Sequence, residues 1–174
     1  MLFRSTPAII VDDVVTAMSD LAHAVATRYT GTVLAITGSA GKTSTKDLLT
    51  QVLAHHGSVV ATQRSFNNEI GFPHTVLRVQ ADTDFLVLEM GARGRGHISH
   101  LAAIARPQIG AVLGIGSAHI GEFGNREAIA VAKRELVEAL DATGIAVLNT
   151  DDPLVAAMAE HTRAQVLRDR KSVV

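Results

Sequence analysis

The sequence predicts an α/β fold, a P-loop-type, doubly wound and mostly parallel sheet with helices on both faces. Short runs of Val, Ile, Leu and Ala alternate with longer segments of helical periodicity through most of the 174 residues. This alternation is typical of parallel strands that are joined by helical crossovers. In addition, the apolar run 33–37 leads through a Gly-containing turn into a helical segment, which is the order of a phosphate-binding strand–loop–helix unit.

The first half of the chain contains two predicted helices and three predicted strands. Asp12 is a candidate N-cap for the first helix, because its carboxylate can accept hydrogen bonds from free backbone N–H groups. The strands are short apolar runs, as expected for strands that are buried on both faces. The expected boundaries are a helix over 13–28, a strand over 33–37, a helix over 42–55, a strand over 59–62, a polar loop over 66–73 and a strand over 85–89.

The second half continues the alternation of helices and strands. Its strands are again apolar runs bounded by turn-forming residues, and a Gly-rich stretch separates one of them from the next helix. The expected boundaries are a helix over 97–105, a strand over 109–115, a loop over 116–124, a helix over 126–140, a strand over 145–148, a helix over 153–161 and a strand over 165–167.

Composition narrows the classes of function. Lys and Arg number 16 against 17 Asp and Glu, so no broad basic surface for nucleic acid or anionic membrane is expected. The absence of cysteine excludes disulfides and thiolate metal sites. The apolar run 8–11 is too short for a signal peptide, and the sequence has no run of about 18 apolar residues. We therefore expect a cytoplasmic protein without membrane insertion.

The segment TGSAGKTS is the strongest chemical signal. Small residues after a buried strand allow backbone N–H groups to converge on phosphate at a helix N-terminus. Lys42 can then reach the β- and γ-phosphates and the Thr43 hydroxyl can bind Mg²⁺, although the general Walker pattern has a glycine where this chain has Ile36. The alternative is an ordinary turn with a surface lysine. The candidate nucleotide-binding residues here are Thr37, Gly38, Ser39, Ala40, Gly41, Lys42, Thr43 and Ser44.

Two further polar residues follow strands that are expected to end at the same edge as this loop. Glu89 ends the predicted strand 85–89, and His119 lies in the loop after the next strand. Ligands of open α/β sheets bind at the carboxyl ends of the strands, so both are candidate ligand-binding residues. The alternatives are a plain strand terminator for Glu89 and a surface position for His119.

Lys133 is anomalous within its helix. At about 100° per residue it shares a stripe with apolar residues, while charged residues occupy the other side of the helix. Lysine is seldom buried in such a stripe, and the alternative is that its ammonium group extends to solvent at the rim. The stripe consists of Ile129, Lys133, Leu136, Val137 and Leu140, and the polar side of Arg134, Glu135, Glu138 and Asp141.

Several segments together resemble the Mur ligase family and its relative folylpolyglutamate synthase. The shortened glycine pattern of TGSAGKTS is characteristic of both, and the family has a loop similar to SAHIGEFG, with Gly121 and Glu122 in the opposite order. Asn67-Asn68 and the sequence LEMGA resemble the Mur ligases that add D-alanyl-D-alanine. The segments that carry the resemblance are TGSAGKTS, FNNEIGFP, LEMGA, SAHIGEFG, AKRE and NTDDP.

The resemblance implies ATP and Mg²⁺ as cofactors and places Asn68 near the triphosphate. It also implies that Thr43 and Glu89 bind one Mg²⁺, and that His119 and a carbamylated Lys133 serve a second. The implied reaction joins D-alanyl-D-alanine to UDP-N-acetylmuramoyl-tripeptide through an acyl phosphate, in a monomeric enzyme. The alternatives are another Mur ligase or folylpolyglutamate synthase, a non-catalytic nucleotide-binding module, and a P-loop switch or hydrolase.

The resemblance also suggests a division of the chain. Residues 1–30 are expected to be a connecting helix from a preceding N-terminal domain, and residues 31–168 part of the central ATP-binding domain. Residues 169–174, DRKSVV, break the apolar pattern and match the translation of a common sequencing-adapter string, so we interpret them as a non-native tail. On this interpretation the chain is a fragment without ligase activity of its own.

Overall fold

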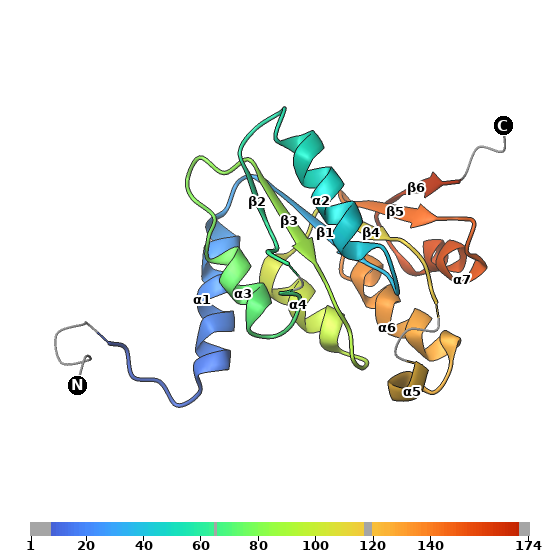
Figure 1. The fold of residues 1–174 in the computed structure, drawn as a ribbon, viewed down its shortest axis with the longest axis horizontal. Helices are drawn as coiled ribbons and strands as arrows, with labels where there is room; N and C mark the ends of the chain where they lie inside the picture. Colours follow the sequence, from blue (N-terminus) through green and yellow to red (C-terminus); the bar gives the residue numbers. More distant parts are fainter. Residues whose placement is uncertain (1–7, 65, 117–119, 171–174) are drawn as a thin grey trace.

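The computed structural model describes residues 8–64, 66–116 and 120–170, and it contains a six-stranded sheet in the order β2-β3-β1-β4-β5-β6 (Figure 1). Every neighbouring pair of strands is parallel. This arrangement confirms the predicted α/β fold. The strands are β1 (Thr32–Thr37), β2 (Val59–Ala61), β3 (Phe85–Glu89), β4 (Ile109–Val112), β5 (Ile145–Asn149) and β6 (Gln165–Asp169).

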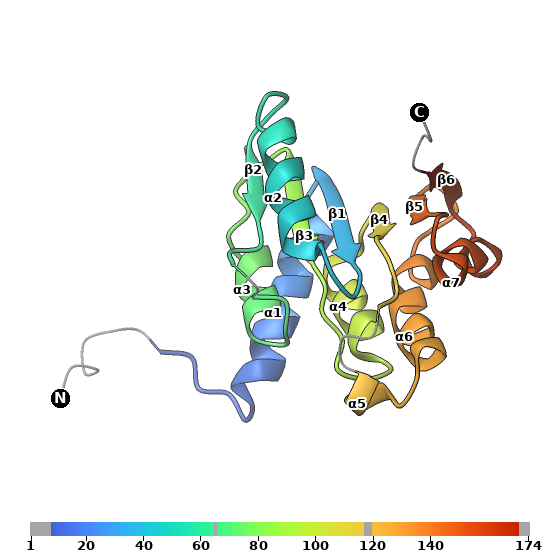
Figure 2. The same cartoon turned by 45° about the vertical axis from the view of Figure 1, so that its right-hand side comes forward.

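Helices cover both faces of the sheet. Figure 2 shows α2 on one side of the sheet, with α1, α3, α4 and α6 on the other. The last described helical segments, α7 and the 3-10 helix η1, pack against β5 and α6. The helices are α1 (Val14–Arg28), α2 (Lys42–Leu53), α3 (Gly71–Val76), α4 (His97–Ala105), α5 (Ile120–Phe123), α6 (Arg126–Glu138), α7 (Pro153–Ala156) and η1 (Ala157–His161).

The central strand β1 is buried on both faces because its alternate side chains enter different apolar clusters. Val33 and Ala35 pack with residues of α1, α4 and α6. Leu34 and Ile36 face the other way, toward the apolar side of α2. This two-sided burial explains why the strand is a continuous apolar run instead of an alternating one.

The strand order reverses at β1. The chain moves from β1 to β2 and β3 on one side, and then returns to β4, β5 and β6 on the other. Ile36 pairs with Glu89 on β3, and Thr37 pairs with Val112 on β4, so the three strands end at nearly the same level. The carboxyl ends of β1, β3 and β4 therefore form the topological switch point where ligands bind in open α/β sheets.

Two helices form where loops were expected. Helix α3 begins within the expected loop 66–73, because Phe72 and Val76 are fully buried in the cluster that α1 also joins. The short helix α5 lies within the expected loop 116–124. In both cases the prediction was wrong because glycine and polar residues in or before the short helix are typical of a loop.

Several boundaries also differ from expectation, most by one or two residues, and three of them have a clear structural reason or consequence. Strand β4 ends at Val112 instead of residue 115, since side chains replace strand partners beyond that point: Asn149 donates to the Leu113 carbonyl, and Asp152 accepts from the Ile115 N–H. The last turns of the expected helix 153–161 are a 3-10 helix. Strand β6 extends to Asp169, whose carbonyl accepts a hydrogen bond from the Thr150 N–H at 2.8 Å.

None of the helices in the described part of the chain combines the length and the apolar character needed to cross a membrane.

Candidate active site

The loop between β1 and α2 is folded against the end of β4. The Ser39 N–H donates to the Gly114 carbonyl at 2.9 Å. A Cβ atom at Gly38 would lie 3.0 Å from the Cβ of Leu113, so a side chain there would force the two loops apart. Gly41, at the start of α2, has φ = 80°, a left-handed conformation that favours glycine. Both glycines of the loop therefore have a backbone reason to be present.

The N-terminus of α2 has the features of an anion-binding site. Among the described residues no side chain caps the first N–H groups of this helix, and such free groups attract phosphate. Lys42 is folded back so that its Nζ donates to the Gly38 carbonyl at 3.0 Å. The Ser39 Oγ is buried without a hydrogen-bond partner in the described part of the chain. An unpaired hydroxyl and a lysine beside a free helix end fit a phosphorylated ligand.

Glu89 lies at the centre of the site and is only 1 % exposed. One of its carboxylate oxygens accepts from the Thr43 hydroxyl at 2.8 Å, and the other accepts from Asn67 Nδ2 at 2.7 Å. Within the described residues no basic side chain forms an ion pair with this carboxylate. Because a buried charge needs a counter-charge, the surplus negative charge and the hydroxyl oxygen of Thr43 fit Mg²⁺, which prefers oxygen ligands.

The two neighbouring asparagines have different contacts. Asn67 donates to Glu89, whereas the Asn68 side chain accepts from the Gly71 N–H at 2.9 Å, at the start of α3. The resemblance implied a role toward the nucleotide for Asn68, and no role was expected for Asn67. Either of two adjacent asparagines could cap the helix or enter the site. The sequence alone does not indicate which of them has which role. The role of Asn68 toward the triphosphate stays a prediction.

Lys133 is 4 % exposed, so the structure buries the lysine of the apolar stripe. Burial, and to a smaller extent the positive charge of Lys42, lower the pKa of its ammonium group to about 8. The electrostatic effect of Lys42 indicates that Lys133 lies toward the carboxyl edge of the sheet, where the phosphate loop is.

The other candidate residues are placed as follows. The Thr37 hydroxyl is buried and donates to the Met90 carbonyl at 3.0 Å, which ties the ends of β1 and β3 together. Ala40, Gly41 and Ser44 are exposed at the loop and the first turn of α2. His119 lies outside the described residues. Within those residues there is no group of three or more His, Cys, Asp or Glu side chains placed to bind a metal.

Further residues that the sequence did not indicate shape the segment after β4, next to the site. One carboxylate oxygen of Asp152 accepts from the Ile115 N–H at 2.7 Å, and the other caps α7 at the Leu154 N–H. Arg126, at the start of α6, donates to the Ile115 carbonyl at 2.6 Å. The segment NTDDP was noted for its resemblance, but no role was assigned to it. Its contacts with the segment after β4 could not be inferred without the strand order.

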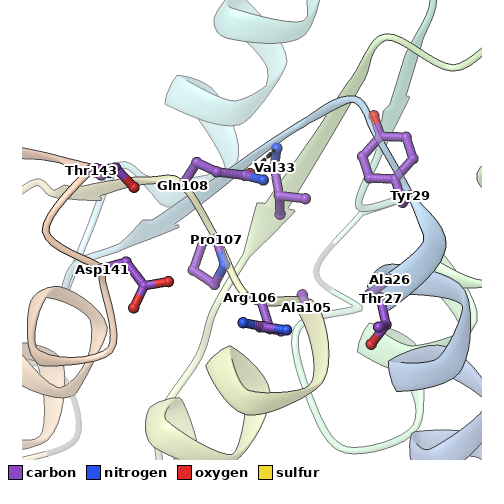
Figure 3. A pocket seen from close by; sticks show the side chains of 11 residues that line it. Ala26, Thr27, Tyr29, Val33, Ala105, Arg106, Pro107, Gln108, Asp141 and Thr143 are labelled. Atoms are coloured by element: carbon purple, nitrogen blue, oxygen red, sulfur yellow. Dashed lines mark hydrogen bonds between the residues drawn. The ribbon is translucent and has the colours of Figure 1, made fainter.

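A hollow of about 190 Å³ lies at the opposite, amino edge of the sheet, below β1 and β4 (Figure 3). Gln108 lines it and accepts from the Val33 N–H at 2.7 Å. None of the candidate site residues contributes to this hollow.

Comparison with known proteins agrees with this geometry. The family model of the Mur ligase middle domain matches residues 36–170. The UDP-N-acetylmuramoyl-tripeptide–D-alanyl-D-alanine ligase of Mycobacterium leprae is 56 % identical over 158 residues, which cover 89 % of this chain and 31 % of that protein.

Two solved structures have the same fold. MurF from Acinetobacter baumannii superposes with a TM-score of 0.87 at 31 % identity, over 92 % of this chain and 36 % of that one. MurF ligase from Thermotoga maritima, solved in complex with ADP, superposes with a TM-score of 0.86 at 35 % identity, over 97 % of this chain and 39 % of that one.

The chain spans about a third of the length of the curated relatives it matches. The match to the middle-domain model begins within β1 and extends beyond the end of β6, so it includes the phosphate loop, Glu89 and Lys133. This chain therefore belongs to the Mur ligase family, of which it represents the middle domain.

Proposed function

We propose that this chain is the nucleotide- and Mg²⁺-binding core of an ATP-dependent ligase that joins D-alanyl-D-alanine to UDP-N-acetylmuramoyl-tripeptide. The observation that carries the proposal is the contact of Thr43 with the buried carboxylate of Glu89, directly after the phosphate loop. The ligase of Mycobacterium leprae, at 56 % identity, supports the choice of reaction over folylpolyglutamate synthase or a non-catalytic module.

The proposed reaction has two steps. The carboxylate of the tripeptide substrate attacks the γ-phosphate of ATP, so that a P–O bond to ADP breaks and an acyl phosphate forms. The amine of D-alanyl-D-alanine then attacks the acyl carbon, and inorganic phosphate leaves. Phosphoryl transfer depends mainly on positioning and on neutralising charge, and bound Mg²⁺ would supply part of that neutralisation.

The residues of this chain would position the phosphates and the Mg²⁺ ions. The Nζ of Lys42 would leave the Gly38 carbonyl for the β- and γ-phosphates, and the free N–H groups at the start of α2 would bind phosphate oxygens. Thr43 and Glu89 would hold one Mg²⁺. His119, which lies outside the described residues, and Lys133 would serve a second.

We also propose that Lys133 acts as a carbamate. A lysine with a pKa near 8 is partly neutral under physiological conditions. The nitrogen lone pair of the neutral amine adds to carbon dioxide, an N–C bond forms, and one proton is released to solvent. The product is an anionic oxygen ligand, which suits Mg²⁺ better than an amine does.

Substitution of Lys42 tests the proposed function. In the full-length ligase, Lys42→Ala should lower kcat about 100- to 1000-fold, as expected for loss of one charged contact in a site of this kind. The measurement is ATP-dependent joining of the two peptide substrates, with release of phosphate. Arg163→Ala is a matched control, because it removes an exposed charge next to β6 and should leave the rate unchanged. Near-normal ligation by Lys42→Ala would show that the loop does not act on ATP.

A further inference from the structure

Helix α2 carries a buried cation that has no part in the proposed chemistry. Within this helix only Lys46 is buried, at 4 % exposure. Its Nζ donates to the Thr62 carbonyl at 2.8 Å and lies 2.7 Å from a carboxylate oxygen of Asp47. Burial of an ammonium group is costly, and an ion pair with a carboxylate that is 57 % exposed contributes little to stability. The presence of a charge here therefore calls for another explanation.

Thr62, the residue that Lys46 contacts, is also hydrogen-bonded to Glu89 of the site. Thr62 follows β2 and is 1 % exposed. Its Oγ1 accepts from the Glu89 N–H at 3.0 Å, and its own N–H donates to the Val87 carbonyl at 3.0 Å. Thr62 thus holds the backbone of β3 at the residue whose carboxylate is buried in the site.

These contacts close a ring with α2. Lys46 and Thr43 are three residues apart, so they are neighbours on the surface of the helix. Thr43 reaches the Glu89 carboxylate at 2.8 Å, and Lys46 reaches the Glu89 backbone through Thr62. The helix that begins at the phosphate loop therefore fixes Glu89 at two points, the carboxylate and the main-chain nitrogen.

We propose that Lys46 is a positioning residue: by holding the Thr62 carbonyl it fixes the backbone of Glu89 relative to Thr43, and so sets the geometry in which the two side chains bind a divalent cation. The consequence for the cation rests on the proposed function. The ring itself rests only on the hydrogen bonds among the side chains and backbone of Thr43, Lys46, Thr62 and Glu89. Loss of a group that orients a metal ligand typically lowers metal affinity about 10- to 100-fold.

The first test is amide hydrogen exchange of the 174-residue chain, without nucleotide or metal. Lys46→Met keeps the aliphatic stem and removes the donor, and it should speed exchange of the Glu89 N–H about 10-fold. Lys46→Arg keeps a cationic donor and should restore slow exchange. Asp47→Asn is the matched control, because it removes the ion pair and leaves the ring intact, and exchange at Glu89 should not change.

Thr62→Val removes the hydroxyl group that accepts the hydrogen bond from the Glu89 N–H. It should also speed exchange at Glu89, and the double variant Lys46→Met/Thr62→Val should be no faster than the faster single variant, because both act on one linkage. Unchanged exchange at Glu89 in Lys46→Met would overturn the proposal. If Lys46→Met does not fold, Thr62→Val is the deciding variant. A normal exchange rate of the Glu89 N–H in Thr62→Val would likewise overturn the proposal.

The second test measures ATP binding by calorimetry over a range of Mg²⁺ concentrations. Lys46→Met should need about 10-fold more Mg²⁺ for half-maximal binding, with ATP affinity in the absence of Mg²⁺ unchanged. A purely structural lysine would lower the melting temperature and leave the Mg²⁺ requirement of the folded protein as it is, which would overturn the proposal. If the unsubstituted chain binds no nucleotide, the proposed function fails, while the exchange experiment still decides the role of Lys46.

Discussion

Tyr29 has a buried hydroxyl group that makes no hydrogen bond within the described part of the chain. Burial raises its pKa to about 12, and the negative charge of Asp84 acts in the same direction. Tyr29→Phe removes an unpaired polar group, so we expect the free energy of unfolding at pH 7 to rise by up to about 1 kcal/mol. Urea denaturation of the two proteins measures this difference.

The difference in stability between the unsubstituted protein and Tyr29→Phe should depend on pH. Between about pH 10 and 12 the folded state keeps the Tyr29 proton while the unfolded state loses it, so the stability of the unsubstituted protein falls with pH in this window. The free energy of unfolding of Tyr29→Phe should not show this part of the decrease. The difference in free energy of unfolding between the two proteins should therefore increase with pH in this window. A constant difference from pH 7 to 12 would mean that the hydroxyl is solvated in the folded protein.

At the scale of elements, Glu135 joins two helices that are far apart in sequence. It lies on α6, and its two carboxylate oxygens accept from the Gly96 N–H at 2.6 Å and the Ser99 N–H at 3.0 Å, at the start of α4. Glu135→Gln removes the charge from a helix N-terminus and leaves one N–H facing an amide donor. The free energy of unfolding should fall by about 1 kcal/mol, measured by urea denaturation.

Glu138→Gln is the matched control for this prediction. Glu138 lies one turn further along α6 and pairs with Arg134 at 2.7 Å, an exposed i,i+4 contact. Its loss should cost no more than about 0.5 kcal/mol. Equal effects of the two substitutions would show that the Glu135 cap adds nothing to the packing of α4 on α6.

At the scale of the whole molecule, the fold brings Lys133 of α6 under the electrostatic influence of Lys42, more than 90 residues earlier. If the full-length protein is the proposed ligase, its Lys133→Ala variant should be nearly inactive, since the proposed carbamate cannot form. Bicarbonate alone should not restore the rate, whereas a short-chain carboxylic acid that fills the vacated space should restore part of it. Steady-state ligation assays with and without the acid measure the effect.

The unsubstituted ligase is the control for this rescue, and the acid should not raise its rate. If Lys133→Ala ligates at close to the normal rate, the carbamate proposal is wrong, and the buried lysine serves only the packing of α6 against the sheet.

The sequence by itself determined most of the elements and the strand–loop–helix order around residues 37–44. Apolar runs locate the strands because each strand is buried on both faces, and the periodicity of α6 identified Lys133 as a residue of its buried side. Glu89 was recognisable because it ends an apolar strand, and its place at the carboxyl edge follows from the parallel sheet. These features depend on neighbours along the chain.

Only the tertiary structure decided which side chains meet at that edge. The register of β3 against β1 and the rotation of α2 bring Thr43 and Asn67 to the Glu89 carboxylate and connect Lys46 to its backbone. Helix α3 likewise exists because its apolar residues are buried against α1, a contact between distant segments. Such pairings depend on strand order and helix orientation, which local periodicity does not encode.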